Sequence, residues 1–170
     1  MTPIKQGGIG ALIVGASLFI ARFEGERLTP YYDQGGVLTI CYGETERVQS
    51  DDVATHEECI KKLEKKTQQI ISLVYNEIGV VPDKTAIALS SFCYNVGVGN
   101  CKRSVAFRKI KDGDELGGCQ AILNWSRVGK NNKMLAPRRI KEKNLCVAGY
   151  LKRESLNEDQ VKKIFGDLNE

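Results

Sequence analysis

Hydrophobic and polar positions follow two different periods along this chain. From Thr55 to about Ile78, apolar side chains recur every three or four residues, which predicts an amphipathic helix. Thr55 and Glu58 have the spacing of a capping box at its start, and Gly79 follows its end. In residues 37–42 the side chains alternate between two faces, as in a half-buried strand. The chain therefore combines helices with at least one short strand.

Prolines, glycines and capping residues elsewhere in the chain predict more helices. One helix is expected from Pro82 toward Asn95, and residues 95–100 are interpreted as a loop rich in glycine. Capping residues or prolines predict further starts at Ser104, Asp114, Pro137 and Ser155. We expect an α+β fold in which a small antiparallel sheet lobe, about residues 25–55, and a larger helical lobe border a cleft.

The first twenty-two residues differ from the rest. Residues 6–21 are uncharged and consist mostly of Gly, Ala, Ile, Leu and Val. The run is short and glycine-rich for a spanning helix, which needs about 20 apolar residues, and it lacks a convincing cleavage site. Three interpretations stay open: a first amphipathic helix over Gly15–Phe23, a permanent anchor, or a weakly apolar segment that enters the membrane and later leaves it intact.

Two carboxylates and a hydroxyl follow this run. Glu24 lies where the apolar helix is expected to stop, Asp33 opens a Gly-Gly turn, and Thr39 lies on the predicted strand. Glycosidases use one protonated carboxyl and one ionised carboxylate in this way. In the plainer alternative, Glu24 is a solvated helix-end residue and Asp33 is a turn former.

The surrounding residues resemble the active-site segment of the phage-type lysozymes, glycoside hydrolase family 24. The first block that carries the resemblance consists of Glu24, Gly25, Arg27, Leu28, Tyr31, Asp33, Gly35, Gly36, Thr39, Ile40, Tyr42 and Gly43. A second block runs from Phe92 to Asn100 and includes Ser104, and a third contains Trp125, Gly129, Leu135, Arg138, Arg139 and Glu142. Two positions depart from the usual pattern: Leu38 replaces a frequent tryptophan, and Glu44 replaces a frequent histidine. Glu44 either adds negative potential near the cleft or is a solvated strand-end residue.

The resemblance implies roles for particular residues. Glu24 is expected to be the general acid, with Asp33 and Thr39 positioning or activating water. Asn95 and Ser104 are expected to face the substrate from the helical lobe. Arg138, with its neighbour Arg139, is expected either to contact the acidic peptide of the substrate or to pair with glutamates of the same lobe. Trp125 either stacks on a sugar ring or belongs to the core.

The activity implied by the resemblance is hydrolysis of the β-1,4 bond between N-acetylmuramic acid and N-acetylglucosamine in peptidoglycan. The reaction is expected to invert the configuration of the anomeric carbon, and its biological role is expected to be lysis of the host cell. No metal and no organic cofactor is expected. Two alternatives remain: a lytic transglycosylase, which would use Glu24 without water, and a non-catalytic wall-binding protein.

Size and charge agree with this expectation. The 170 residues amount to one domain, which we expect to be a monomer. The net charge of +4 suits an anionic cell wall or membrane surface. Basic residues cluster after residue 100, but no aromatic-interleaved RNA motif or helix-turn-helix pattern accompanies them, so no nucleic-acid partner is expected.

Six cysteines indicate disulfides formed in an oxidising compartment. A zinc site is improbable because His56 is the single histidine and no Cys-x-x-Cys pair occurs. Fifteen pairings are formally open. The family resemblance favours Cys41–Cys59, Cys93–Cys101 and Cys119–Cys146.

Disulfides require export, and the only candidate export signal is the N-terminal run. Residues 1–22 resemble the signal-arrest-release segment of some phage endolysins, and the cysteines favour this interpretation, with a lysozyme domain at 23–170. This predicts transient tethering to the inner membrane through residues 1–22 and then release into the host periplasm. The alternative is a cytoplasmic enzyme that depends on a holin for its release.

Overall fold

The computed structural model describes residues 6–33, 35–127 and 134–154. The chain divides into two compact units, residues 1–69 and residues 70–170. The boundary falls inside the long helix α2 (His56–Ile78). The division therefore lies later than the sheet lobe predicted over residues 25–55.

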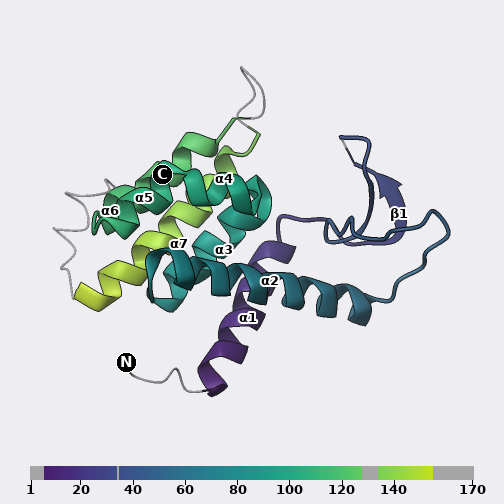
Figure 1. The fold of residues 1–170 in the computed structure, drawn as a ribbon, viewed down its shortest axis with the longest axis horizontal. Coiled ribbons are helices and arrows are strands. Elements are labelled where there is room, and N and C mark those ends of the chain that lie inside the picture. The colour runs from purple at the N-terminus through teal and green to yellow at the C-terminus, as the bar shows by residue number, and fades with distance from the viewer. Residues whose placement is uncertain (1–5, 34, 128–133, 155–170) are drawn as a thin grey trace. The chain divides into compact units, whose positions relative to one another are not determined.

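The first unit contains a helix and a two-stranded sheet ahead of α2. Helix α1 (Gln6–Ala21) buries Leu12, Ala16 and Ile20, which lie four residues apart on one face. Strand β1 (Arg27–Tyr32) pairs antiparallel with β2 (Leu38–Cys41) (Figure 1). The antiparallel sheet is confirmed, whereas a first helix that begins only at Gly15 is wrong, because α1 already begins at Gln6.

The strand expected over 37–42 is shorter and more buried than its pattern predicts. It spans Leu38–Cys41, and Val37 before it is 47% exposed. Ile40 and Cys41 point to opposite faces, yet both are buried, so the strand is not half-buried. A tight turn explains its end, because Ile40 and Glu44 exchange backbone hydrogen bonds of 2.9 Å. Strand β1 had no alternating pattern and was not predicted.

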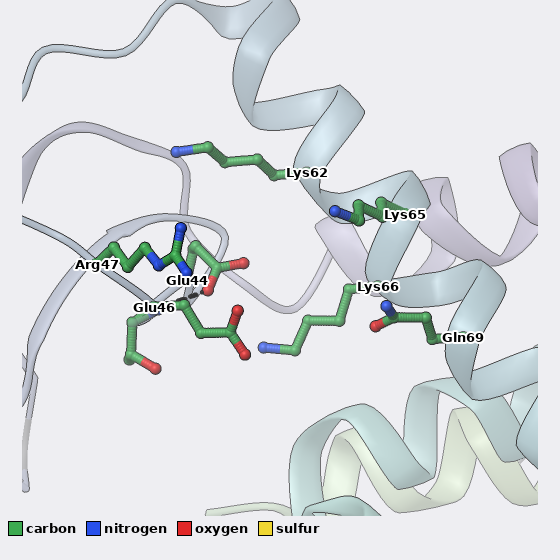
Figure 2. A pocket seen from close by; sticks show the side chains of 8 residues that line it. Glu44, Glu46, Arg47, Lys62, Lys65, Lys66 and Gln69 are labelled. Carbon is green, nitrogen blue, oxygen red and sulfur yellow. Dashed lines mark hydrogen bonds between the residues drawn. The ribbon is translucent and has the colours of Figure 1, made fainter.

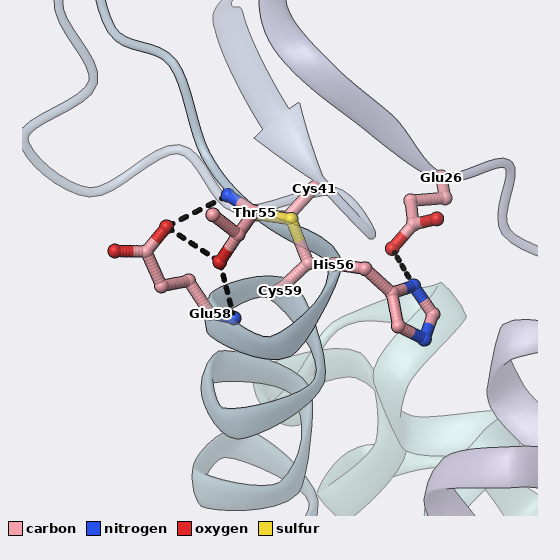
Figure 3. Close-up of a disulfide and its surroundings, with 6 residues drawn as sticks. All are labelled: Glu26, Cys41, Thr55, His56, Glu58 and Cys59. Atoms are coloured by element: carbon pink, nitrogen blue, oxygen red, sulfur yellow. Dashed lines mark hydrogen bonds and ion pairs between the residues drawn. A yellow bond between two sulfur atoms is a disulfide. The ribbon is translucent and has the colours of Figure 1, made fainter.

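The capping box that opens α2 is confirmed (Figure 3). The backbone N–H of Glu58 donates to the Thr55 hydroxyl at 3.2 Å, and the N–H of Thr55 donates to the Glu58 carboxylate at 2.7 Å. Gly79 ends the helix with φ +84°, the left-handed conformation that glycine adopts readily. Local sequence thus determines both ends of α2.

The second unit is helical in the residues described. Helix α3 (Asp83–Val96) packs along α7 (Ala136–Glu154), with α5 and α6 next to each other (Figure 1). The other elements are α4 (Val98–Arg103), α5 (Val105–Lys111), α6 (Glu115–Ala121) and a 3-10 turn η1 (Ile122–Trp125). Fully buried side chains at its centre include Leu89, Phe92, Ile122 and Val147. This apolar contact is the core of the unit.

The predicted helix starts in this unit are confirmed, but the predicted loop is wrong. The Ser104 hydroxyl accepts the N–H of Phe107, and the Asp114 carboxylate accepts that of Gly117, so each residue is an N-cap. Residues 95–100 are not a loop, because α3 runs to Val96 and α4 starts at Val98. The single residue between them, Gly97, has φ +84° and allows this sharp break. Gly129 and the helix start at Ser155 lie outside the described residues.

All six cysteines are paired as the resemblance implied. Cys41–Cys59 joins β2 to α2, Cys93–Cys101 joins α3 to α4, and Cys119–Cys146 joins α6 to α7. Each bond therefore ties two elements within one unit. In the part of the chain that is described, no helix is both long enough and apolar enough to cross a membrane.

Candidate active site

Glu24 is fixed by the exit of α1. The backbone N–H groups of Phe23 and Glu24 both donate to the carbonyl of Ile20, at 2.9 and 3.2 Å. Because Ile20 is fully buried, this turn has a rigid base. The Glu24 residue itself is half-buried.

Asp33 lies in the exposed turn between β1 and β2. Its Oδ1 accepts the N–H of Gly35 at 2.8 Å and that of Val37 at 2.9 Å. The turn also requires Gly36, whose φ is +75°. The hydrogen bonds expected of a turn former are therefore present, and both use Oδ1 alone.

Thr39 lies opposite Tyr31 in the sheet and is 2% exposed. Its hydroxyl donates to the carbonyl of Val37 at 2.8 Å. Val37 thus connects two of the predicted residues, since its N–H binds the Asp33 carboxylate and its carbonyl binds Thr39. Asp33 and Thr39 share one hairpin in the same unit as Glu24.

The segment after Glu24 is tied to the start of α2. Nδ1 of His56 lies 2.7 Å from Oε1 of Glu26 (Figure 3). Tyr42 also hydrogen-bonds Glu26, and burial, followed by the charge and hydrogen bond of Glu26, raises the pKa of Tyr42. His56 is exposed at the helix start, as predicted. Its partnership with Glu26 was missed, because nothing in the local sequence links residues 30 positions apart.

In the helical unit, two of the predicted substrate-facing residues, Asn95 and Arg138, belong to a polar network around the buried Glu142. Nε of Arg138 donates to Oε1 of Glu142 at 2.9 Å, and the hydroxyl of Ser91 donates to the same oxygen at 2.6 Å. Arg139 donates to the other Glu142 oxygen and to Oδ1 of Asn95. The sequence left two alternatives for Arg138 and Arg139, contact with the substrate or pairing with glutamates of the same lobe. The structure shows the pairing, with Glu142 as the glutamate.

Two further predicted residues have structural contacts. Ser104 is 3% exposed and its hydroxyl caps α5. Trp125 is half-buried and packs edge-on against Phe92 with ring centroids 5.9 Å apart, and its backbone carbonyl accepts a hydrogen bond from Nε of Arg139. Core packing therefore accounts for the contacts of Trp125.

Other charged groups have local roles. Glu44 accepts the N–H groups of Thr45 and Glu46, at 3.0 and 2.9 Å, and so helps to fold its own turn. From the basic cluster after residue 100, Lys102 pairs with Glu77, and Lys109 lies 2.6 Å from Asp114. Among the described residues, no group of three or more His, Cys, Asp or Glu side chains is arranged to hold a metal ion.

A two-stranded hairpin unit followed by a helical unit built on α3 and α7 defines a lysozyme-type fold. The chain belongs to the phage lysozyme family, whose profile matches residues 21–142. It is 36% identical to the SAR-endolysin of bacteriophage PS119 over 88% of this chain and 98% of that protein. It is 37% identical to the SAR-endolysin of Pseudomonas phage phiKMV, over 85% of this chain and 91% of that protein. Among solved structures, it is similar to the muramidase domain of SpmX from Asticaccaulis excentricus, with a TM-score of 0.71, 25% identity, and 86% and 99% of the two chains covered.

These similarities confirm the resemblance seen in the sequence and the α+β lysozyme-like fold. The protein is an endolysin, a glycoside hydrolase of the lysozyme type that cleaves peptidoglycan. The matched region begins at residue 21 and so contains Glu24, Asp33 and Thr39.

Proposed function

We propose that Glu24, Asp33 and Thr39 carry out this hydrolysis, with Glu24 as general acid. The observation that supports the proposal is the connection of Asp33 and Thr39 through Val37, in the same unit as the turn that fixes Glu24. One carboxyl lies on a partly buried turn and the other lies in an exposed turn of the same unit.

The chemistry assigns one task to each side chain. Glu24 protonates the leaving glycosidic oxygen. Asp33, whose Oδ1 is engaged by the turn, orients the attacking water through Oδ2 and accepts the proton that this water releases. The Thr39 hydroxyl donates to Val37, so its lone pairs accept a hydrogen of the same water. Water attack on the face opposite the leaving group inverts the anomeric centre, which requires carboxyl groups about 6.5–9.5 Å apart.

For the helical unit, we propose support of the substrate-binding surface. Arg138 and Ser104 are buried, and their polar atoms already bind Glu142 and Ser91, and the N–H of Phe107, respectively. Asn95 is half-buried and is held by Arg139. We therefore propose that Arg138 and Ser104 position the surface and that Asn95 is the member of the set that contacts substrate.

A substitution at Asp33 separates hydrolysis from the transglycosylase alternative. Asp33→Asn keeps an oxygen acceptor for the turn but removes the charge, so a hydrolase should lose at least 100-fold in glycan cleavage. A transglycosylase should keep most of its activity and yield anhydro sugars. The matched control is Asp52→Asn, because Asp52 also accepts a backbone N–H, from Gln49, in an exposed turn. Unchanged cleavage by Asp33→Asn would contradict the proposed role.

We also propose that the enzyme is exported and acts in the host periplasm as a monomer. Three disulfides require an oxidising compartment, and α1 is an uncharged helix directly before Glu24. Several relatives bear the name SAR-endolysin. Residues 1–22 would tether the chain to the inner membrane and then leave it. Helix α1 would then fold together with the β1–β2 hairpin of the lysozyme domain, which comprises residues 23–170.

Cell fractionation tests this localisation. Cells that express the full chain should hold it first in the membrane fraction and then in the periplasmic fraction, with its cysteines protected from alkylation. A chain that stays in the cytoplasm with reactive cysteines until a holin is supplied would contradict export. Sedimentation of the periplasmic form should give the mass of one chain, 18.8 kDa.

A further inference from the structure

The unit of residues 1–69 contains a cationic pocket that the proposed catalytic residues do not use. It has a volume of about 490 Å³ and lies between the loop at residues 44–47 and one side of α2 (Figure 2). Arg47 lines it from the loop, and three lysines line it from the helix: Lys62, Lys65 and Lys66. Four cationic side chains therefore converge on one hollow, facing two carboxylates, Glu44 and Glu46.

The two carboxylates do not cancel this charge. Oε1 of Glu44 already accepts two backbone N–H groups of its own turn. The side chain of Glu46 points toward that of Lys66 (Figure 2), which leaves an excess of positive charge in the pocket. Arg47 is held at φ +55°, a left-handed conformation that long side chains rarely adopt.

A second hollow of about 380 Å³ adjoins the first. Its walls are Ile13 and Val14 of α1 on one side, and Lys61, Glu64 and Lys65 of α2 on the other. Lys65 lines both hollows, so the cationic pocket and a hollow with an apolar wall share this residue.

The same helix also leaves apolar side chains in solvent. Val14 is 46% exposed and Leu18, one turn later, is 57% exposed. These two residues lie on one face of α1 because they are four positions apart. A cationic pocket next to exposed aliphatic side chains matches the two parts of a phospholipid, a phosphate headgroup and an acyl chain.

We propose that the two hollows form a site for an anionic phospholipid of the phosphatidylglycerol class, through which the folded enzyme binds a membrane surface. Arg47, Lys62 and Lys65 hold the phosphate, and Ile13 and Val14 contact the start of the acyl chains. Which membrane the enzyme meets in the cell rests on the proposed export. The binding itself requires neither export nor catalysis.

Vesicle co-sedimentation with the purified, oxidised full chain tests the proposal. Vesicles of phosphatidylcholine mixed with phosphatidylglycerol should bind at least tenfold more tightly than pure phosphatidylcholine vesicles. Changing Lys62, Lys65 and Lys66 to glutamine should weaken this binding about 100-fold, because each basic residue near an anionic surface contributes about fivefold. The control of equal net charge changes Lys84, Lys111 and Lys141, which are exposed and lie in the other unit, and should bind within threefold of wild type.

Two further variants separate this site from general charge attraction and from catalysis. Val14→Ser should weaken binding several-fold, because it removes apolar surface that contacts the acyl region. Glu24→Gln should bind vesicles like wild type even though it is expected to be inactive. Inorganic phosphate in the millimolar range should compete only weakly, since it offers no acyl chain.

Three results would overturn the proposal. The first is equal binding to neutral and anionic vesicles, and the second is equal loss in the two triple-lysine variants. The third is the absence of vesicle binding together with binding of soluble muropeptides that the Lys62, Lys65 and Lys66 changes abolish. That last result would assign the pocket to the acidic peptide stems of the cell wall.

Discussion

Two ion pairs with the same spacing in sequence show how differently the two units use charge. Glu57 and Lys61 on α2 of the first unit have side chains 76% and 69% exposed. Arg138 and Glu142 on α7 of the second unit are 6% and 0% exposed, and Glu142 also binds Arg139 and Ser91. Both pairs are separated by four residues on a helix, but only the second is buried and shares its glutamate with further partners.

The difference extends to the units as wholes. The first unit holds its hairpin with exposed hydrogen bonds, one disulfide and the pair between His56 and Glu26. The second unit buries a polar network between α3 and α7, in which Ser91 and Arg138 both bind Glu142. The contacts that hold the hairpin of the first unit therefore lie at the surface, whereas this network of the second unit is buried.

The largest effect on stability should come from breaking the buried network. Glu142→Gln leaves Arg138 and Arg139 without their counter-charge in a buried site, which should lower the free energy of unfolding by about 3–5 kcal/mol. Glu57→Gln breaks the exposed pair and should cost no more than about 1 kcal/mol. Urea denaturation of the oxidised proteins measures both values. Similar losses in the two variants would show that burial does not separate the pairs.

Removing one disulfide from each unit should sharpen the comparison. Changing Cys41 and Cys59 to alanine, or Cys119 and Cys146, should cost about 3 kcal/mol in either case, because the closed loops have similar lengths. Only the first variant should also lose activity well below its melting temperature, since Cys41 ends the strand that carries Thr39. Thermal unfolding and wall-clearing rates at low temperature measure the two effects. Equal activity losses would contradict the placement of the catalytic groups in the first unit.

A smaller effect is expected at the start of α2. Thr55→Ala removes the hydroxyl that accepts the N–H of Glu58, and loss of such a cap costs about 1 kcal/mol. Thr55→Ser keeps the hydroxyl and is the matched control. A melting temperature equal to that of wild type in Thr55→Ala would show that the disulfide from Cys59 holds this turn without the cap.

The pH dependence of the same turn gives the smallest effect. Hydrogen bonds from the Thr55 backbone and then from its hydroxyl lower the pKa of Glu58. Because the folded-state pKa lies below the unfolded value of about 4.3, the stabilisation is complete above that pH. It is lost as the pH falls through the lowered folded-state pKa. Glu58→Gln should therefore show a shallower loss of melting temperature than wild type between pH 5 and 3, and parallel curves would contradict this.

Local signals in the sequence predicted the helix boundaries well. The capping residues Thr55, Ser104 and Asp114 and the terminating Gly79 all act as expected, because caps depend on neighbours within a turn. Helix α4 was missed because Gly97 was interpreted as part of a loop, whereas it breaks the chain for a single residue. Strand β1 was missed because pairing with β2, and not its own pattern, makes it a strand.

In the candidate site, too, contacts between sequence neighbours could be predicted and contacts between distant residues could not. The sequence around Glu24, Asp33 and Thr39 predicted a helix exit, a turn and one strand, all of which form from neighbouring residues. The burial of Arg138 against Ser91 and Glu142 could not be predicted. It depends on contact between two helices, and Arg138 and Ser91 are 47 positions apart in the sequence. Long-range packing also hides the link between Glu26 and His56.

The central claim is that Glu24 supplies the proton for glycan cleavage. The most direct measurement is the rate at which Glu24→Gln, compared with Glu57→Gln, clears suspensions of outer-membrane-permeabilised bacteria. Glu24→Gln should lose at least 100-fold in rate while its melting temperature stays close to that of wild type, and Glu57→Gln should remain as active as wild type. A folded Glu24→Gln protein that clears the suspension at the wild-type rate would contradict the account.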